Sequence, residues 1–227
     1  SSKLHCNEEA NPAAVLSLLD LGCNAGDLSM QLHERLVAAR SPAAGKTIRT
    51  VLVGVDVDEA LIARAQGKAR KSSDVRFVCA DVCDPAARAR LCATLRGLSG
   101  GGGGERDDTA DETRFDVTSC FGLTMWIHLN RGDTGLASFL HGIAELTACT
   151  LLIEIHPWKN YKAAVKRLRK MSKDLVPPHW PHIASRGPGA PEQTVDRILL
   201  DSGFVRVKEL GATHWGRTVR TYERKAA

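Results

Sequence analysis

The chain has 227 residues, which is enough for one well-buried domain and short for two independent ones. No apolar run approaches the roughly 20 residues that a membrane span needs, so we expect no membrane partner. The net charge of +5 is compatible with acidic polymers as partners. Seven cysteines, an odd number without paired spacing, argue against a secreted disulfide scaffold and favour the cytoplasm, with the nucleus as a second location.

The first half of the chain alternates strand and helix patterns. An apolar strand from Val15 to Leu21 is followed by a glycine turn and by a helix that begins near Asp27. A connector then leads to a second strand and helix, and to a third strand and a helix opened by proline. These elements are Ser41 to Lys46, Thr50 to Val57, Glu59 to Arg70, Val75 to Ala80 and Pro85 to Leu98.

A low-complexity segment separates the two halves. Five consecutive glycines, Gly100 to Gly104, precede an acidic stretch from Glu105 to Glu112. Such composition predicts a flexible loop over about residues 99 to 113, and this loop contributes nothing to the fold class.

The second half continues the alternation and ends in two strands. The expected elements are a strand, Phe115 to Cys120; a helix, Thr134 to Leu146; a strand, Thr150 to Ile155; a basic helix, Tyr161 to Lys173; a proline-rich loop through Pro191; a helix, Glu192 to Ser202; and strands at Phe204 to Leu210 and Thr218 to Arg224. This pattern predicts a single α/β domain over residues 1–227, with a Rossmann-like, doubly wound, mostly parallel seven-stranded sheet and a C-terminal antiparallel hairpin. We expect a monomer.

The turn after the first strand, Asp20 to Asp27, indicates the kind of cofactor. A dinucleotide fingerprint needs three closely spaced glycines, but Asn24 stands where the second would be. Asp27 at the helix entrance would also repel a diphosphate. S-adenosylmethionine carries no phosphate, and an acidic turn is compatible with its amino acid moiety. The turn therefore favours a methyl donor over a dinucleotide.

Acidic residues at the ends of the next two strands extend this cofactor site. Asp56 could hold a ribose diol, and Asp81 is suitably placed for an adenine edge. A strand-end aspartate alone is more often a helix cap, so the argument depends on the succession of such turns. The cofactor contacts that we expect are Gly22, Asn24, Gly26, Asp56, Val57, Asp81, Val82 and Phe121.

Two segments at the same rim contain a large share of the few aromatic residues. Thr124 to Asp133 follows the fourth strand, and Glu154 to Tyr161 follows the fifth; we expect both to be loops that carry tryptophans. Aromatic rings at an active rim can stack on nucleobases or enclose a sulfonium.

At these segments the chain resembles the Bicoid-interacting family of RNA methyltransferases. The similar motifs are Gly22-Cys23-Asn24-x-Gly26-Asp27-Leu28-Ser29, Thr124-Met125-Trp126-Ile127-His128-Leu129-Asn130-x-Gly132-Asp133 and Pro157-Trp158-Lys159-x-Tyr161-x-Ala163-Ala164-x-x-Arg167-Leu168-Arg169-Lys170. The resemblance spans about Leu19 to Arg224.

The resemblance implies O-methylation of a 5′-terminal RNA phosphate. One branch of the family caps a 5′-triphosphate on a small nuclear RNA, and another methylates 5′-monophosphates of precursor microRNAs and histidine tRNA. Met125 stands where the triphosphate branch has a lysine, which favours the monophosphate branch.

The chain departs from the family pattern in three places. We expect no counterpart of the family's N-terminal aromatic and basic segment. The family's Glu-Pro-Gln-Pro-Trp reads here as Glu154-Ile155-His156-Pro157-Trp158, and the loop around the glycine run does not align.

Methyl transfer to a phosphate oxygen depends more on positioning the two reactants than on a general base, because the oxygen is already anionic. We expect His128 and Lys159 to be the catalytic groups, each with an alternative as an ordinary core or surface residue. Trp126, Asn130, Trp158 and Tyr161 are the expected contacts with the terminal nucleotide.

The helix after Tyr161 carries a basic stripe. Lys162, Lys166 and Arg169, continued by Lys170 and Lys173, lie opposite an apolar face of Ala164, Val165, Leu168 and Met171. The stripe is either a solvated face or a contact with an RNA backbone, and its place beside the rim favours RNA. Cys23, Cys79, Cys83 and Cys120 lack metal-ligand spacing, so we expect small buried residues and no metal.

Three other functions stay open at this point. A small-molecule or protein methyltransferase would have no need of the basic helix. A non-catalytic RNA-binding module would bind RNA without cofactor. A dehydrogenase is disfavoured by the incomplete glycine pattern.

Overall fold

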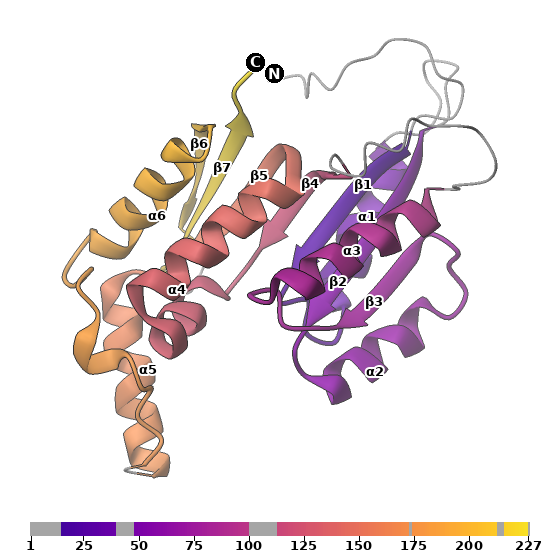
Figure 1. Ribbon diagram of the computed structural model, residues 1–227. Helices are drawn as coiled ribbons and strands as arrows, with labels where there is room; N and C mark the ends of the chain where they lie inside the picture. The colour runs from indigo at the N-terminus through magenta and orange to yellow at the C-terminus, as the bar shows by residue number, and fades with distance from the viewer. Residues whose placement is uncertain (1–14, 40–47, 100–112, 173, 213–215, 227) are drawn as a thin grey trace. The chain divides into compact units, whose positions relative to one another are not determined.

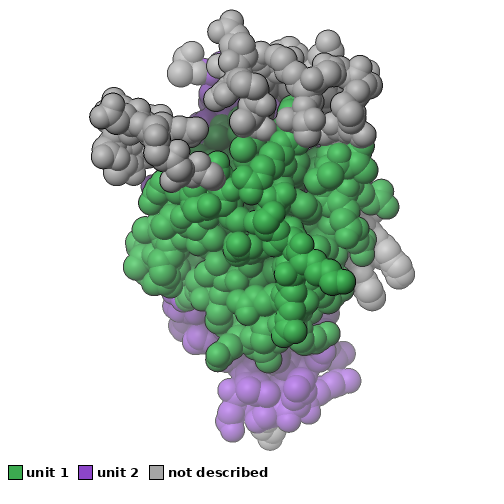
Figure 2. Space-filling model, turned by 90° about the vertical axis from the view of Figure 1, so that its right-hand side faces the viewer, with its two compact units in different colours: residues 1–118, 146–149 green, residues 119–145, 150–227 purple. Residues whose placement is uncertain are grey.

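The structure is a computed structural model that describes residues 15–39, 48–99, 113–172, 174–212 and 216–226. The expected connector at Ser41 to Lys46, the segment from Gly100 to Glu112, and Lys173 lie outside these ranges. The chain divides into two compact units, residues 1–118 with 146–149 and residues 119–145 with 150–227, which Figure 2 colours separately. The expectation of a single domain stays a prediction.

Seven strands form one sheet in the order β3-β2-β1-β4-β5-β7-β6 (Figure 1). Strands β1, β2 and β3 are parallel, whereas β7 runs antiparallel to β5 and β6. This confirms the expected mostly parallel sheet with a C-terminal hairpin. The strands are β1 (Val15–Leu21), β2 (Arg49–Asp56), β3 (Val75–Cys79), β4 (Phe115–Cys120), β5 (Thr147–Ile155), β6 (Phe204–Ala212) and β7 (Thr218–Arg224).

The elements of the first unit form because its strands are apolar and two of its helices have capping residues at their N-termini. Strands β1 and β2 are buried along most of their length, as expected of central parallel strands. The Asp58 side chain accepts a hydrogen bond from the Leu61 amide, and Asp84 caps a helix that begins with Pro85. The helices are α1 (Asp27–Ala39), α2 (Glu59–Ala69) and α3 (Pro85–Leu98).

The second unit contains α4 (Thr124–Leu146), α5 (Trp158–Met171), the short 3-10 helix η1 (Trp180–His182) and α6 (Ala190–Asp201). An apolar cluster joins α4 and α5 to the segment after η1. Its buried members are Met125, Leu129, Tyr161, Ala164, Val165 and Ile183, and Trp126, Trp158 and Trp180 pack against them.

The expectation that the two tryptophan segments are loops is wrong. Residues Thr124 to Arg131 form the first part of α4, and Trp158 to Tyr161 form the first turn of α5. The spacing of Met125 and Leu129, one helical turn apart, places both on the buried face. Gly132 interrupts α4 with a φ of 70°, and only the helix beyond this kink was predicted.

Two further expectations about burial are wrong. Met171 is 71% exposed, because the apolar cluster around α5 ends at Val165. Cys79 is exposed at the end of β3 and Cys83 is half-buried, whereas Cys23 and Cys120 are buried as expected. Within the described ranges, no helix combines the length and the apolar character that crossing a membrane requires.

Candidate active site

The turn after β1 is shaped by three residues with positive φ. Gly22, Asn24 and Gly26 have φ of 73°, 53° and 78°. The amides of Gly22 and Cys23 donate to the Val55 carbonyl, which joins the turn to the end of β2. Such a conformation favours glycine and tolerates asparagine, so the residue types follow from the shape of the turn.

Carboxylates surround this turn. Asp56 accepts hydrogen bonds from the Asn24 amide at 3.0 Å and from the Asp58 amide at 3.1 Å. The buried Asp20 accepts from the Ser29 hydroxyl. Burial, with Asp20 and Asp56 nearby, raises the pKa of the Cys23 thiol, so this thiol stays protonated.

Two cations of α2, Lys68 and Arg64, lie near the turn, and both act on Asp27. Lys68 donates to the Ala25 carbonyl at 2.7 Å and to Asp27 at 2.6 Å. The backbone amides from Gly22 to Gly26 already donate to protein acceptors, so the turn presents mainly carboxylates. Carboxylates suit the ammonium of an amino acid and a ribose diol, and they disfavour a diphosphate. Asp81 caps the turn after β3 through the Cys83 amide, while Val82 is buried and Val57 is 67% exposed.

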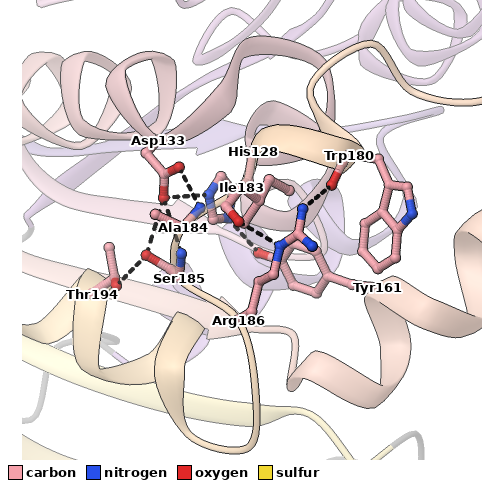
Figure 3. A network of polar contacts seen from close by, with 9 residues as sticks. All are labelled: His128, Asp133, Tyr161, Trp180, Ile183, Ala184, Ser185, Arg186 and Thr194. Atoms are coloured by element: carbon pink, nitrogen blue, oxygen red, sulfur yellow. Dashed lines mark hydrogen bonds and ion pairs between the residues drawn. The ribbon is translucent and has the colours of Figure 1, made fainter.

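In the second unit, His128 lies at the centre of a polar network (Figure 3). Its side chain is fully buried, with Nδ1 3.1 Å from the Tyr161 hydroxyl and Nε2 3.2 Å from Asp133. Because a carboxylate only accepts hydrogen bonds, Nε2 donates to Asp133 and the tyrosine donates to Nδ1. Burial lowers the pKa of His128, although Asp133 partly opposes this, and burial raises the pKa of Tyr161.

Asp133 ties the segment after η1 to α4. Its carboxylate accepts from the Ala184 amide at 2.8 Å and from the Ser185 hydroxyl at 3.1 Å, as well as from His128. Burial would raise the pKa of Asp133, but these hydrogen bonds lower it overall. The Thr194 hydroxyl continues the network from α6 to Ser185.

Three aromatic rings stack beside this network. The Trp158 ring stacks on Tyr161 at 5.3 Å and on Trp180 at 5.1 Å between centroids. Arg186 holds the loop that carries Trp180 by donating to the Trp180 carbonyl, and its guanidinium lies over the Trp180 ring. Trp180 was not among the expected site residues, because nothing in the periodicity of a proline-rich segment indicates its partner.

A groove of about 500 Å³ runs along α5 beside Trp180. The basic stripe supplies most of its lining, and Trp180 supplies an aromatic wall. The lining residues are Lys162, Val165, Lys166, Arg169, Lys170 and Trp180. The structure thus brings together three expected substrate contacts, Lys162, Lys166 and Arg169, on one surface.

The end of β5 carries a partly buried ion pair that the sequence did not indicate. Arg217, just before β7, donates to Glu154 at 3.0 Å. The expected catalytic residue Lys159 is exposed in the first turn of α5, and its ammonium lies against Gly216. Between these elements His156 is buried; burial, with Arg217 nearby, lowers its pKa to about 4. In the sequence, the only feature that could have pointed to Arg217 was its position directly before the strand Thr218–Arg224.

The other expected contacts come from the segment after β4 and from the first part of α4. Trp126 and Phe121 are half-buried, and exposed Asn130 donates to the Trp126 carbonyl. Met125 is buried in the apolar cluster rather than presented to a phosphate. Among the residues that the structure describes, no group of three or more His, Cys, Asp or Glu is arranged to hold a metal ion.

Comparison with known proteins adds to this geometry. Residues 115–225 match the family model described as "Bicoid-interacting protein 3 (Bin3)". A "RNA 5'-monophosphate methyltransferase" of Rattus norvegicus is 32% identical over 91% of this chain and 68% of its own length. A "Pre-miRNA 5'-monophosphate methyltransferase" of Danio rerio is 29% identical over 92% of this chain and 77% of its own length.

Solved structures show the same fold. Magnesium protoporphyrin IX methyltransferase from Synechocystis PCC 6803, solved with bound SAH, aligns with a TM-score of 0.54 at 18% identity. The alignment covers 95% of this chain and 76% of that one. The fold class expected from the sequence is therefore confirmed as that of class I methyltransferases.

Proposed function

We propose, from the premise that the chain belongs to the Bin3 family, that it transfers a methyl group from S-adenosylmethionine to the 5′-monophosphate of a small RNA. Precursor microRNA and histidine tRNA are the substrate types that the family resemblance implies. The observation that carries the proposal is the groove on α5, in which four cations and Trp180 form a surface suited to an RNA strand.

The turn after β1 is the proposed holder of the cofactor. Its Asp56 carboxylate fits the ribose diol of S-adenosylmethionine, and the acidic turn, where Lys68 is paired with Asp27, disfavours a diphosphate. When bound, S-adenosylmethionine supplies an electrophilic methyl group, which a phosphate oxygen can accept without a general base because it is already anionic near neutral pH.

The residues of the second unit position the RNA. Lys162, Lys166 and Arg169 contact backbone phosphates, and an unpaired base stacks on the exposed part of Trp180. We assign His128 a positioning role, because both of its ring nitrogens are hydrogen-bonded within the protein. One nitrogen contacts the Tyr161 hydroxyl, and the other contacts Asp133, which holds the segment after η1. Lys159 contacts the terminal phosphate directly.

We also infer that the protein acts as a monomer in the cytoplasm, with the nucleus as a second location. Among the described cysteines, Cys79 is exposed and Cys92 is half-buried, and neither is in a disulfide, which suits a reducing compartment.

The test uses one RNA sequence with three different 5′ ends and a labelled methyl donor. The monophosphate end should be labelled, the hydroxyl end should not, and the triphosphate end should be labelled more slowly. Equal labelling of the hydroxyl end would refute a phosphate acceptor. Tight RNA binding without any labelling would instead support a non-catalytic RNA-binding module, and faster labelling of the triphosphate would support a capping activity.

A further inference from the structure

The ion pair at the end of β5 has the properties of an oriented anion-binding group. Glu154 is buried, with only 9% of its side chain exposed, whereas 30% of the Arg217 side chain is exposed. The Arg217 Nη1 donates to Glu154 Oε2 at 3.0 Å. A buried carboxylate that holds one end of a guanidinium fixes the direction in which the remaining N–H groups can point.

The strand register explains why Arg217 lies at this place. Antiparallel pairing sets Thr218 opposite Ile155. Arg217, which precedes Thr218, therefore lies at the level of His156, directly after the end of β5. The backbone after β4 passes beside the pair, since a Cβ on Gly122 would lie 3.6 Å from both Arg217 Nη1 and Glu154 Oε2. Arg217 therefore lies where β4 and β5 end, which is the edge at which ligands bind in sheets of this class.

A second cation lies close to Arg217. The Lys159 ammonium is 3.0 Å from the place that a Cβ on Gly216 would take, and Gly216 directly precedes Arg217. Of the ion pairs between described residues, none involves Lys159. The first turn of α5 has no acidic residue and no side-chain cap, so its amides add to the positive potential around Lys159.

His156 adds no third charge at neutral pH. Its side chain is 1% exposed, and burial, with Arg217 nearby, lowers its pKa to about 4. The end of β5 thus carries two cations, one buried carboxylate and a neutral histidine. A terminal monophosphate carries a charge of about −1.5 to −2 near pH 7, and the net charge of about +1 on these residues offsets part of it.

We propose that Arg217 and Lys159 together bind the non-attacking oxygens of the RNA 5′-monophosphate, and that Glu154 is the positioning residue for Arg217. This inference rests on the proposed function and adds Arg217 and Glu154 to the residues that recognise the terminal phosphate. A planar guanidinium can donate two parallel hydrogen bonds to a phosphate, and Lys159 supplies a movable point charge.

The alternative is that Arg217 only joins β7 to β5. Removing Arg217 alone would leave Glu154 buried without its partner and would destabilise the fold, so loss of activity would not separate the two roles. The double variant E154Q/R217Q replaces the ion pair by two neutral amides and so leaves no unpaired buried charge, and R217K keeps the charge without the planar fork.

The experiment measures the affinity of the full chain for one RNA carrying either a 5′-monophosphate or a 5′-hydroxyl, and takes the ratio. The wild type should prefer the monophosphate, and E154Q/R217Q should lower this preference about tenfold or more while hydroxyl-RNA affinity stays unchanged. R217K should lose part of the preference. The control R206Q removes an exposed arginine of β6 that is paired with Asp196 of α6, and it should behave like the wild type.

The outcomes separate the two proposals. A wild type without any preference for the monophosphate would refute the proposed function. A clear wild-type preference that persists unchanged in folded E154Q/R217Q and R217K would leave the proposed function standing and overturn the role of Arg217.

Discussion

The turn after β1 and the surface of α5 use different chemical groups for recognition. The turn offers the carboxylate of Asp56, its backbone amides from Gly22 to Gly26 are bonded within the protein, and the nearby Lys68 is paired with Asp27. The surface of α5 offers cations and the stacked rings of Trp158 and Trp180. The first group suits a zwitterionic cofactor without phosphate, whereas the second suits a polyanion with exposed bases.

The two regions also differ in what holds their shape. The turn is fixed by local hydrogen bonds and by a glycine that permits close packing; a Cβ on Gly26 would lie 2.8 Å from the Phe77 ring. The surface of α5 is fixed by Asp133 and Arg186, which hold the segment that carries Trp180. Changes in one region should therefore affect one ligand and leave affinity for the other unchanged, and this separation can be tested.

The largest expected effect is on cofactor affinity. D56A removes the carboxylate proposed to hold the ribose diol and should weaken S-adenosylmethionine binding by about tenfold to a hundredfold, because charge-assisted hydrogen bonds contribute roughly 1.5–3 kcal/mol. Isothermal titration calorimetry with and without RNA measures this. RNA affinity should stay unchanged. D74N, which alters an aspartate paired with Arg49 on the surface, is the matched control; equal loss in both variants would contradict the assignment.

A somewhat smaller effect is expected on RNA affinity. K166A/R169A removes two cations of the groove and should weaken RNA binding about tenfold at physiological salt. The slope of log affinity against log salt concentration should fall by roughly 1.5 to 2, since each phosphate contact releases counterions. Cofactor affinity should not change. The control R64A/K71A removes two exposed cations of the first unit, and a similar change in slope there would indicate non-specific attraction.

The next prediction concerns the support of the Trp180 wall. D133N weakens the hydrogen bonds that residue 133 accepts from the Ala184 amide and from His128. It should lower the free energy of unfolding by about 1–2 kcal/mol. Urea unfolding followed by tryptophan fluorescence measures this, and RNA affinity should fall together with it. If D133N binds RNA and unfolds like the wild type, Asp133 does not hold the segment after η1.

The smallest effect is a change in pH dependence. The pKa of His156 is about 4 in the folded chain and about 6.5 when unfolded, so the unfolded state binds more protons and stability falls as pH drops from about 6.5 toward 4. Between pH 7.5 and 5.5 the wild type should lose about 1 kcal/mol through this group. H156Q should remove that part of the loss. Equal pH dependence of unfolding in both proteins would contradict a neutral buried His156.

The sequence predicted the turn after β1 better than the surroundings of α5, because the turn depends on interactions between residues that are close in the sequence. Strand Val15–Leu21, the turn at Gly22 to Gly26 and helix Pro85–Leu98 depend on local apolar runs, on positive φ and on caps, all of which are visible in neighbouring residues. Arg217, Trp180 and Asp133 acquire their roles through partners 63, 22 and 51 residues away. No periodicity indicates such contacts.

The errors in the second region have the same origin. The segment from Thr124 to Arg131 was expected to be a loop, but it forms a helix because Met125 and Leu129 pack against Tyr161 and Ile183 from elsewhere in the chain. Met171 was placed on the apolar face by its spacing alone, yet nothing in the described part of the apolar cluster covers it. The composition of α5 did predict its basic surface, because charge on a helix face needs no distant partner.

The chemical position of the transferred methyl group tests the central claim most directly. After a single turnover with 5′-monophosphate RNA, nuclease digestion and mass spectrometry of the 5′-terminal nucleotide identify the modified atom. We predict a terminal nucleotide that is heavier by one methyl group and whose phosphate resists phosphatase. A methyl group on a base or a ribose, with a phosphatase-sensitive 5′ end, would contradict the account.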